Sequence, residues 1–349
     1  MRRLPGPPFM TERDRERYSR QILFAEIGEQ GQQRLLSSRA VVVGCGALGS
    51  FQAAALARAG VGEIVIIDRD YVELGNLQRQ WLFDEADAAQ GLPKAAAAAR
   101  RLAAINSGVK VEPQVVDLNS HNAERLLLPA TVILDGTDNF GTRYLINDVA
   151  VKHGLPWIYG GAVGSYGVTM PILPGCSSCL ACVFPEPPGG PQPSCDTAGI
   201  LASASAVIAS LQVADAIKIM TGRREAIEAR LFSIDVWKNT RQSVGTAARR
   251  PSCRVCGERR FTYLEARRRR PISLCGRNAV QVHEKEEPLD LTKLRSTLER
   301  LGPVRASEYA LRFECRPYEM TIFADGRAII KGTEDLGIAR SLYARYVGS

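Results

Sequence analysis

A glycine loop between a β-branched run and an alanine-rich segment constrains the fold of this chain more than any other feature. The residues Val41 to Val43 lead into Gly44, and Gly44, Gly46 and Gly49 match the spacing G-x-G-x-x-G. The segment from Leu48 to Gly60 then predicts a helix. Glycine accepts positive φ and lacks Cβ, so phosphate oxygens can approach backbone N–H groups at the positive end of that helix. The pattern predicts strand, turn and helix around a nucleotide site.

A second buried strand is predicted from Glu63 to Ile67, and it ends in Asp68, nineteen residues past Gly49. An acidic side chain at that place can hold ribose hydroxyls. Up to this point an NAD-dependent dehydrogenase fits as well as any other nucleotide-binding protein. The alternative without a ligand is a glycine-rich packing turn beside a buried strand.

The residues that follow do not suit a dehydrogenase. Cations, a carboxamide and a further acid lie within thirty residues of Asp68; they are Arg69, Asp70, Asn76, Arg79 and Lys94. Hydride transfer needs an apolar nicotinamide pocket, whereas this set suits the binding and polarisation of a triphosphate. A solvated loop whose charges have no function is the alternative.

The order of strand and helix patterns predicts the fold class. Strands are predicted at 40–43, 63–67, 109–116, 131–134 and 157–159, and helices at 48–60, 94–106 and 140–153. This alternation is typical of an α/β protein with a Rossmann-like, doubly wound, mainly parallel sheet. Later runs at 168–173 and 230–236 predict added antiparallel strands.

Nine cysteines in a chain without a recognisable secretory leader indicate metal or thiol chemistry rather than a disulfide framework. Two C-x-x-C pairs, Cys179 with Cys182 and Cys253 with Cys256, together suit a tetrahedral Zn²⁺ site. Their separation is wider than in a compact zinc ribbon. Cys176 forms a third C-x-x-C with Cys179, and a redox dithiol is the alternative to zinc.

Cys195 follows a stretch rich in proline and glycine, Pro185 to Pro193, of a kind that is often mobile. It directly precedes a predicted helix start, where the helix dipole would lower a thiol pKa and favour the thiolate. Cys195 is therefore predicted either as a nucleophile or as a small residue at a helix cap.

The apolar segment from Gly199 to Met220 is long enough to cross a membrane. Gln212, Asp215 and Lys218 argue against a membrane span and favour a buried helix that crosses the sheet. The residues Cys195 to Thr197 are predicted to supply its N-terminal cap.

Six motifs, in order from about residue 12 to about residue 257, resemble the MoeB/ThiF family of bacterial relatives of ubiquitin-activating enzymes. The motifs are Arg17-Tyr18-Ser19-Arg20-Gln21, Gly44 to Gly49, Asp68-Arg69-Asp70, Asn76-Leu77-Gln78-Arg79-Gln80, Gly91-Leu92-Pro93-Lys94 and Asp135-Gly136-Thr137-Asp138-Asn139. The resemblance implies adenylation of the C-terminal glycine of a ubiquitin-like sulfur carrier. One departure is Ala47, where the family often has a further glycine.

The resemblance also implies roles for single residues. Asp68 would bind the ribose of ATP, Asn76, Arg79 and Lys94 would contact its phosphates, and Asp138 would hold Mg²⁺. The reaction joins two anions, because a carrier carboxylate attacks the α-phosphate; Mg²⁺ and fixed cations must therefore neutralise charge. The carboxylate is already ionised at pH 7 and needs no base, which agrees with histidines that share no catalytic or metal spacing.

Further assignments come from the same resemblance. Arg20 would reach into the site of a neighbouring subunit, which implies a homodimer. Cys195 matches a cysteine that some members use in a thioester or acyl-disulfide step, and the four paired cysteines would hold a structural zinc. The antiparallel strands would shape the docking surface of a carrier ending in Gly-Gly, with a sulfurtransferase or cysteine desulfurase as a further partner.

Composition and charge set the remaining expectations. A chain of 349 residues with 45% hydrophobic residues can bury a large core and a second small one. The predicted organisation is a disordered extension at 1–11, an adenylation domain at 12–258, a basic linker at 259–271 and a small α+β domain of unknown role at 272–349. An Arg- and Pro-rich start predicts a cytoplasmic protein.

The formal net charge of +8 permits an acidic carrier, tRNA or a merely solvated surface. No aromatic platform for RNA is visible, so we expect an acidic carrier and no nucleic-acid partner. The alternatives to a carrier adenylyltransferase are an ATP-using relative that acts on tRNA as a dehydratase, and a non-catalytic scaffold. The carrier pathway and the sulfur source are not encoded in these motifs.

Overall fold

The computed structural model describes residues 10–187, 195–265, 272–274, 278–284, 289–307 and 310–348. Expectations for residues 1–9, for most of the stretch 185–193 and for the arginine run 267–270 lie outside the described residues. The chain forms two compact units, Met1–Glu265 and Ala266–Ser349, which are treated separately below.

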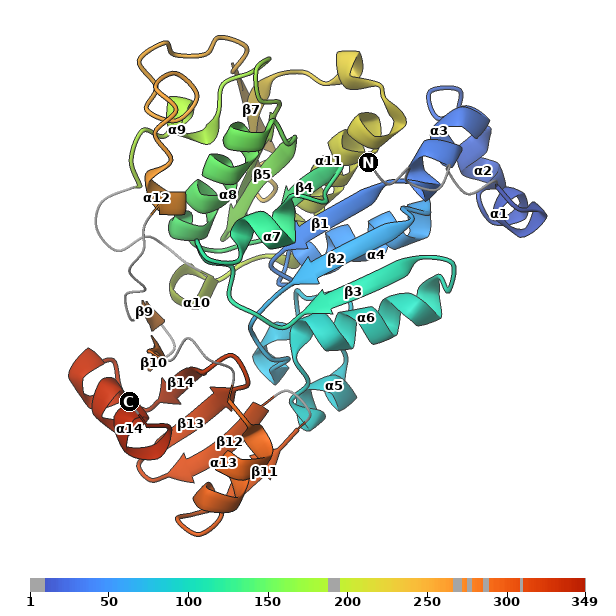
Figure 1. The fold of residues 1–349 in the computed structure, drawn as a ribbon. Helices are drawn as coiled ribbons and strands as arrows, with labels where there is room; N and C mark the ends of the chain where they lie inside the picture. The colour runs from blue at the N-terminus through green and yellow to red at the C-terminus, as the bar shows by residue number, and fades with distance from the viewer. Residues whose placement is uncertain are drawn as a thin grey trace, which may run out of the picture. The chain divides into compact units, whose positions relative to one another are not determined.

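The first unit is built on an eight-stranded sheet with the strand order β3-β2-β1-β4-β5-β6-β7-β8 (Figure 1). The strands are β1 (Arg39–Val43), β2 (Glu63–Ile67), β3 (Lys110–Gln114), β4 (Val132–Asp135), β5 (Trp157–Val163), β6 (Tyr166–Ile172), β7 (Arg230–Asp235) and β8 (Thr240–Gly245). Strands β1 to β5 pair in parallel, and β6, β7 and β8 extend the sheet by antiparallel pairing. The predicted mainly parallel Rossmann-like sheet with added antiparallel strands is confirmed, although β8 was not predicted.

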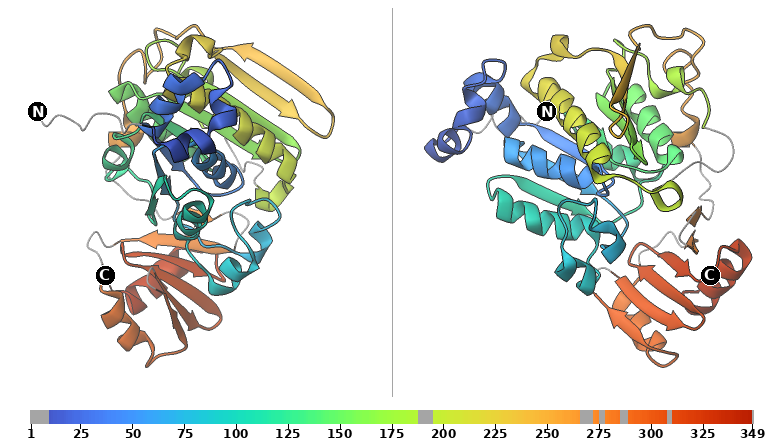
Figure 2. Two further views of the ribbon diagram at one scale, coloured as in Figure 1. Left: turned by 90° about the vertical axis from the view of Figure 1, so that its right-hand side faces the viewer. Right: turned by 180° about the vertical axis from the view of Figure 1, so that it is seen from behind.

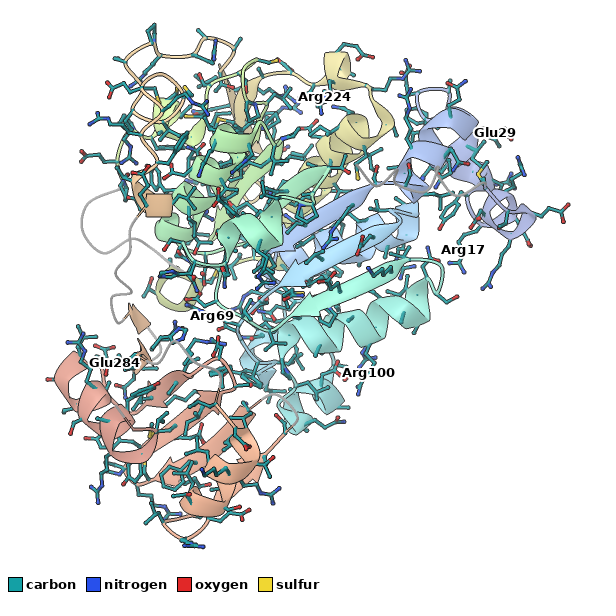
Figure 3. The ribbon with its side chains drawn as sticks, viewed as in Figure 1. Arg17, Glu29, Arg69, Arg100, Arg224 and Glu284 are labelled. Carbon is teal, nitrogen blue, oxygen red and sulfur yellow. The ribbon has the colours of Figure 1, made fainter. Side chains whose placement is uncertain are left out.

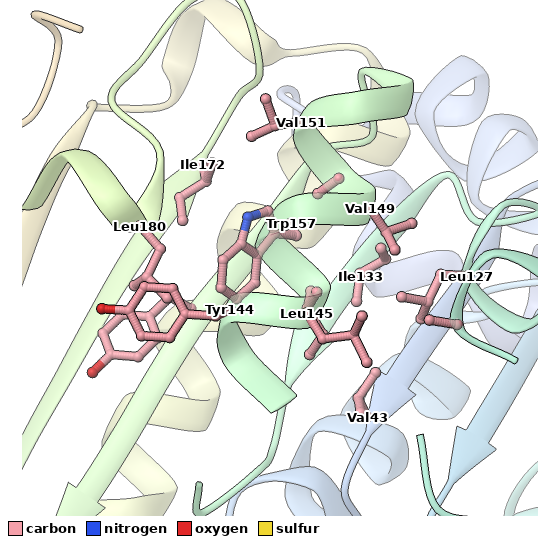
Figure 4. Close-up of a cluster of buried hydrophobic side chains, with 14 of the residues drawn as sticks. Val43, Leu127, Ile133, Tyr144, Leu145, Val149, Val151, Trp157, Ile172 and Leu180 are labelled. Atoms are coloured by element: carbon pink, nitrogen blue, oxygen red, sulfur yellow. The ribbon is translucent and has the colours of Figure 1, made fainter. Parts of the chain in front are cut away.

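Helices cover both faces of this sheet. One face carries α4 (Gly49–Ala59), α6 (Lys94–Ile105) and α11 (Ala202–Thr221), and the other carries α7 (Ala123–Leu127) and α8 (Phe140–His153), as Figures 1 and 2 show from opposite sides. Alternate residues of β1 supply the two cores: Val41 and Val43 pack toward α8, whereas Ala40 and Val42 pack toward α4. Figure 4 shows the α8 core, where Tyr144 and Leu145 meet Ile133 and Trp157.

Helix α11 is long and apolar enough to cross a membrane by length and composition, but it packs against β5, β6 and α4. Its buried Gln212 donates to the backbone carbonyls of Asp135 and Ile158, so the polar residue is satisfied by the sheet. The predicted buried helix is confirmed. The predicted cap is wrong, because Cys195–Ala198 forms a separate turn, α10, and Leu201 precedes α11 without a side-chain cap.

Three short helices precede the sheet: α1 (Glu12–Arg17), α2 (Ser19–Ile22) and α3 (Gly28–Leu36). Met10 is buried and Thr11 caps α1, so these two residues are ordered and do not belong to a disordered extension. Tyr18 lies against Gly60, and its hydroxyl accepts a hydrogen bond from Asn106 at 2.8 Å. The first motif therefore fastens the N-terminal helices to the end of α4.

The second unit has a six-stranded antiparallel sheet in the order β11-β12-β13-β14-β10-β9. Its elements are β9 (Ile272–Leu274), β10 (Ala279–His283), α13 (Leu291–Leu298), β11 (Val304–Ala306), β12 (Ala310–Cys315), β13 (Tyr318–Phe323), β14 (Arg327–Lys331) and α14 (Leu336–Tyr346). Leu298 and Tyr343 from the two helices pack with Phe313, Met320 and Ile330 of the sheet. The predicted α+β character is confirmed.

Candidate functional site

The glycine loop joins β1 to α4 and needs glycine for two different reasons. Gly44 has a φ of +86°, and a Cβ there would lie 2.6 Å from the carbonyl oxygen of Gly136. A Cβ on Gly49 would overlap the carbonyl oxygen of Gly44. A Cβ on Gly46, in contrast, would meet only the side-chain amide of Gln80, at 3.9 Å. The room at Gly46 is therefore left for a ligand rather than for packing, which fits a phosphate group.

Ala47 replaces a glycine that the family often has in this loop. The only non-glycine residues with positive φ in the described part of the chain are Asn239, Arg259 and Asn278. Ala47 adopts an ordinary backbone conformation, so an alanine is accommodated without strain.

Asp68 follows β2 and is fixed to the loop by hydrogen bonds. One carboxylate oxygen accepts from the backbone N–H of Cys45 at 2.5 Å, and the other accepts from that of Asp70 at 2.7 Å. Burial raises the pKa of Asp68, while the nearby Lys94 ammonium acts in the opposite direction. The carboxylate is held rigidly beside the glycine loop, where a ribose hydroxyl would bind. Cys45 is a buried packing residue.

Lys94 begins α6 and is only 3% exposed. Its ammonium lies 3.4 Å from a carboxylate oxygen of Asp70, and its backbone N–H donates to the Asp70 carbonyl at 2.8 Å. Arg69, labelled in Figure 3, pairs with Asp117 at 3.0 Å. The structure thus brings together Asp68, Asp70 and Lys94, three residues that the sequence predicted for one site.

The short helix η1 (Leu74–Asn76) carries the remaining phosphate candidates. Asn76 is 7% exposed, and its buried Oδ1 has no hydrogen-bond partner among the described residues. Arg79 is half-buried and donates to the carbonyl of Gly75 at 2.9 Å. Arg79 uses one guanidinium nitrogen for this local carbonyl, so its other N–H groups are available to an anionic ligand.

Asp138 is exposed in the turn after β4, and the turn is held by a buried ion pair that the sequence analysis missed. Asp135 accepts from the backbone N–H and hydroxyl of Thr137 at 2.9 and 2.7 Å, and from Arg143 Nε at 3.0 Å. Arg143 donates to the carbonyls of Thr137 and Gly160 at 2.7 and 2.9 Å. Asp135 belongs to one of the six family motifs, but no sequence pattern predicted its pairing with Arg143, eight residues later.

Asp138 lies near two arginines, Arg143 and Arg69, which are each paired with another carboxylate. The charge of Asp138 helps to raise the pKa of both Arg143 and Arg69 above the usual arginine value, although burial of each arginine opposes this. Asp138 is thus an exposed carboxylate with two guanidinium groups in its neighbourhood. A hard cation such as Mg²⁺ takes carboxylate oxygens of this kind, so the residue fits the predicted metal ligand.

We expect Arg143→Leu to lower the free energy of unfolding of the first unit by about 3–5 kcal/mol, because it leaves the Asp135 carboxylate buried without its cation. Urea unfolding measured by circular dichroism tests this. Lys152→Ala is the matched control, since Lys152 forms an exposed pair with Glu124 and should change the free energy by less than about 1 kcal/mol. Equal losses of unfolding free energy in Arg143→Leu and Lys152→Ala would contradict the role of Arg143 as the partner of a buried Asp135.

Arg20 lies on α2 and is exposed. Within the described part of the chain, no hydrogen bond or ion pair joins it to the nucleotide site. Tyr18 and Gln21 of the same motif turn inward, with Gln21 donating to the Ala59 carbonyl at 2.9 Å. Arg20, like Arg17 of the same motif, is exposed to solvent.

Four cysteines from the two predicted pairs meet at one point. Their sulfur atoms all lie within 4.8 Å of one another, with Cys179 to Cys253 at 3.6 Å and Cys182 to Cys256 at 3.3 Å. Sulfur atoms bound to one Zn²⁺ at 2.3 Å stand about 3.8 Å apart, so the set fits a tetrahedral structural zinc. Cys176 is exposed and stays outside the cluster, in agreement with the predicted choice of ligands.

The cluster joins segments that are far apart in the sequence. Cys179 and Cys182 belong to the start of α9 (Leu180–Val183), and Cys253 and Cys256 lie in a tight turn before α12 (Thr262–Glu265). Helix α12 was expected within a linker, but Asp148 of α8 accepts from the backbone of its Tyr263 at 2.8 Å. Residues 262–265 are therefore part of the first unit.

Cys195 is half-buried at the start of α10, and its sulfur lies 3.9 Å from the carbonyl oxygen of Ala162 at the end of β5. The helix behind it has only four residues, because α11 begins separately at Ala202. The long helix dipole that we expected to act on this thiol is therefore not aligned with it. Whether Cys195 takes part in chemistry stays a prediction.

The fold and the site define a protein with a Rossmann-like sheet, a glycine loop beside charged residues that suit a triphosphate, and a four-cysteine cluster that suits a metal ion. The model of the ThiF family matches residues 18–255, and the chain belongs to this family. The resemblance to MoeB/ThiF proteins is confirmed.

The similar proteins agree on the class of reaction. The sulfur carrier protein ThiS adenylyltransferase of Bacillus subtilis is 45% identical over 336 residues, covering 95% of this chain and 99% of that protein. The SAMP-activating enzyme E1 of Haloferax volcanii is 39% identical over 70% of this chain and 89% of its own length. The Bacillus match extends well beyond residue 255, so that relative shares most of the second unit.

Among solved structures, the Escherichia coli enzyme MccB with ATP has a TM-score of 0.60 at 26% identity, covering 69% of this chain and 74% of its own. MccB with AMPCPP and MccA has a TM-score of 0.62 at 27% identity, covering 73% of this chain and 77% of its own. Both structures hold a nucleotide on a fold similar to that of the first unit.

Proposed function

We propose that this protein is an adenylyltransferase that uses ATP to activate the C-terminal glycine carboxylate of a ubiquitin-like sulfur carrier. The observation that carries the proposal is the convergence of Asp68, Asp70 and Lys94 beside the open glycine at position 46. The relatives named above are adenylyltransferases or activating enzymes of such carriers. The product would be the carrier adenylate, and pyrophosphate would leave.

The residues divide the work of the reaction among binding, positioning and charge neutralisation. Asp68 holds the ribose, and the loop N–H groups beside Gly46 donate hydrogen bonds to phosphate oxygens. Asn76, Arg79 and Lys94 bind the phosphates and keep the α-phosphate in line with the carrier carboxylate. Asp138 would hold Mg²⁺, which would supply neutralisation of phosphate charge when bound. The chain needs no general base, because the attacking carboxylate is already an anion.

Four further parts of the proposal concern the cysteine cluster and the partners. We propose that the four-cysteine cluster holds zinc, and that Arg20 completes the site of a second subunit in a homodimer. The exposed strand β8 and the exposed Trp237 in the β7–β8 turn give the antiparallel edge a surface suited to the carrier. A sulfurtransferase or cysteine desulfurase would act on the adenylated carrier afterwards.

ATP–pyrophosphate exchange tests the function directly. We expect exchange of labelled pyrophosphate into ATP only when a carrier that ends in Gly-Gly is present, because the exchange requires reversible adenylate formation. A carrier truncated by its two terminal glycines is the control and should give none. Absence of exchange with every such carrier, or ATP hydrolysis that depends on tRNA, would contradict the proposal.

A further inference from the structure

Helix α8 carries three fully buried polar side chains on one of its sides. They are Tyr144, Asn147 and Asp148, each with 0% of its surface exposed. Residues three and four positions apart are neighbours on a helix surface, so these three side chains face the same surroundings. Buried polar side chains are hydrogen-bonded in folded proteins, and here the partners are backbone groups of other segments.

Two of these side chains bind the segment of the first cysteine pair. The Tyr144 hydroxyl donates to the carbonyl of Phe184 at 2.6 Å, and Asn147 Oδ1 accepts from the N–H of Leu180 at 2.9 Å. Leu180 directly follows Cys179, and it belongs with Tyr144 to the core cluster of Figure 4. The backbone on both sides of the first pair is therefore fixed to α8.

The segment that follows the second cysteine pair is held by the same side of α8. Asp148 Oδ2 accepts from the N–H groups of Tyr263 and Leu264 at 2.8 and 3.3 Å. The Tyr263 ring also stacks on the Tyr144 ring, with the centroids 4.9 Å apart. Helix α8 thus binds both segments of the four-cysteine cluster, and a zinc ion bound there would fix their mutual geometry.

The N-terminal end of α8 leads directly into the turn that carries Asp138. The next residue, Asn139, caps the helix, because its side chain accepts from a backbone N–H of the first turn at 2.8 Å. Arg143, one position before the first of the buried polar residues, bonds to Asp135 and to the carbonyl of Thr137 at 3.0 and 2.7 Å. A rigid helix can carry a displacement from the cysteine segments to this turn.

We infer that Tyr144 and Asn147 are positioning residues, which transmit the geometry of the metal-bound four-cysteine cluster through α8 to Asp138. Zinc in the cluster thereby increases the affinity of the nucleotide site for MgATP. The inference rests on the proposed function, from which ATP and the role of Asp138 toward Mg²⁺ are taken. Asp68, Lys94 and the glycine loop belong to other elements, so binding of ATP without Mg²⁺ does not depend on this coupling.

Tyr144→Phe tests the inference, because it removes one hydroxyl and keeps the ring. We expect the dissociation constant for MgATP, measured by calorimetry on the zinc-loaded full chain, to rise about threefold to tenfold. The dissociation constant for ATP without Mg²⁺ should stay unchanged. Asn147→Ala should give the same pattern, and so should the original protein freed of zinc and kept below its melting temperature.

Tyr343→Phe is the matched control, because the Tyr343 hydroxyl also donates to a backbone carbonyl, that of Gly326, in the second unit. It should change neither dissociation constant. If Tyr144→Phe binds MgATP as the original protein does, or loses affinity for ATP equally with and without Mg²⁺, the inference is wrong while the proposed function stands. If Mg²⁺ does not strengthen ATP binding to the original protein, the role of Asp138 and the inference fail together. If the original protein does not bind ATP at all, the proposed function fails as well.

Discussion

Lys94→Ala should lower kcat/KM for carrier-dependent ATP–pyrophosphate exchange by about a thousandfold or more. The ammonium is buried at the start of α6, and it is a cation that the structure holds beside Asp68 and Asp70. A fixed cation in a site with little water stabilises the charge that develops on the phosphates far more than it would in solvent. Exchange of labelled pyrophosphate at varied ATP concentration measures the loss.

The control for this change is Lys110→Ala, which removes an exposed lysine that pairs with Glu63 at 2.7 Å. It should leave exchange within about twofold of the original protein, because the pair lies on the surface. Asp138→Ala should also abolish exchange if that residue holds the metal. A Lys94→Ala protein that is folded and retains more than a tenth of the original kcat/KM would contradict the assigned role of Lys94.

Cys253→Ser should reduce bound zinc from about one ion per chain to almost none and lower the melting temperature by about 5–15 °C. The reason is that Cys253 and Cys256 tie the end of the first unit to Cys179 and Cys182, and a tetrahedral site with three thiolates loses most of its affinity. Metal analysis by mass spectrometry and thermal unfolding check both effects. Prolonged treatment of the original protein with a chelator should give the same shift.

Cys176→Ser provides a control of the same chemical kind. Cys176 is three residues from Cys179 and forms a C-x-x-C with it, but it is exposed and outside the cluster. The variant should keep its zinc and its melting temperature. Zinc loss from Cys176→Ser, with zinc retained in Cys253→Ser, would reverse the assignment of ligands.

Local patterns predicted the elements that matter most for the site. The strand Glu63–Ile67 and the helix Phe140–His153 were predicted at their observed boundaries, because a β-branched run and a segment closed by glycine each carry a strong local signal. Less regular segments were missed: β8 is exposed along its whole length and has no apolar alternation to mark it. The N-terminal cap of α11 was misplaced, since Gly199 and Leu201 separate the short turn α10 from the long helix.

The sequence by itself determined the glycine loop, the acid at position 68, the charged residues up to Lys94 and the two cysteine pairs, because each depends on spacing within a short stretch of chain. Tertiary structure alone decided which distant groups meet: Arg143 with Asp135, Cys179 with Cys253, and Gln80 with the open side of Gly46. Such pairings depend on sheet order and helix packing, which bring together residues that no local period relates. The buried side-chain oxygen of Gln80 also shows this, since only packing reveals that it has no hydrogen-bond partner among the described residues.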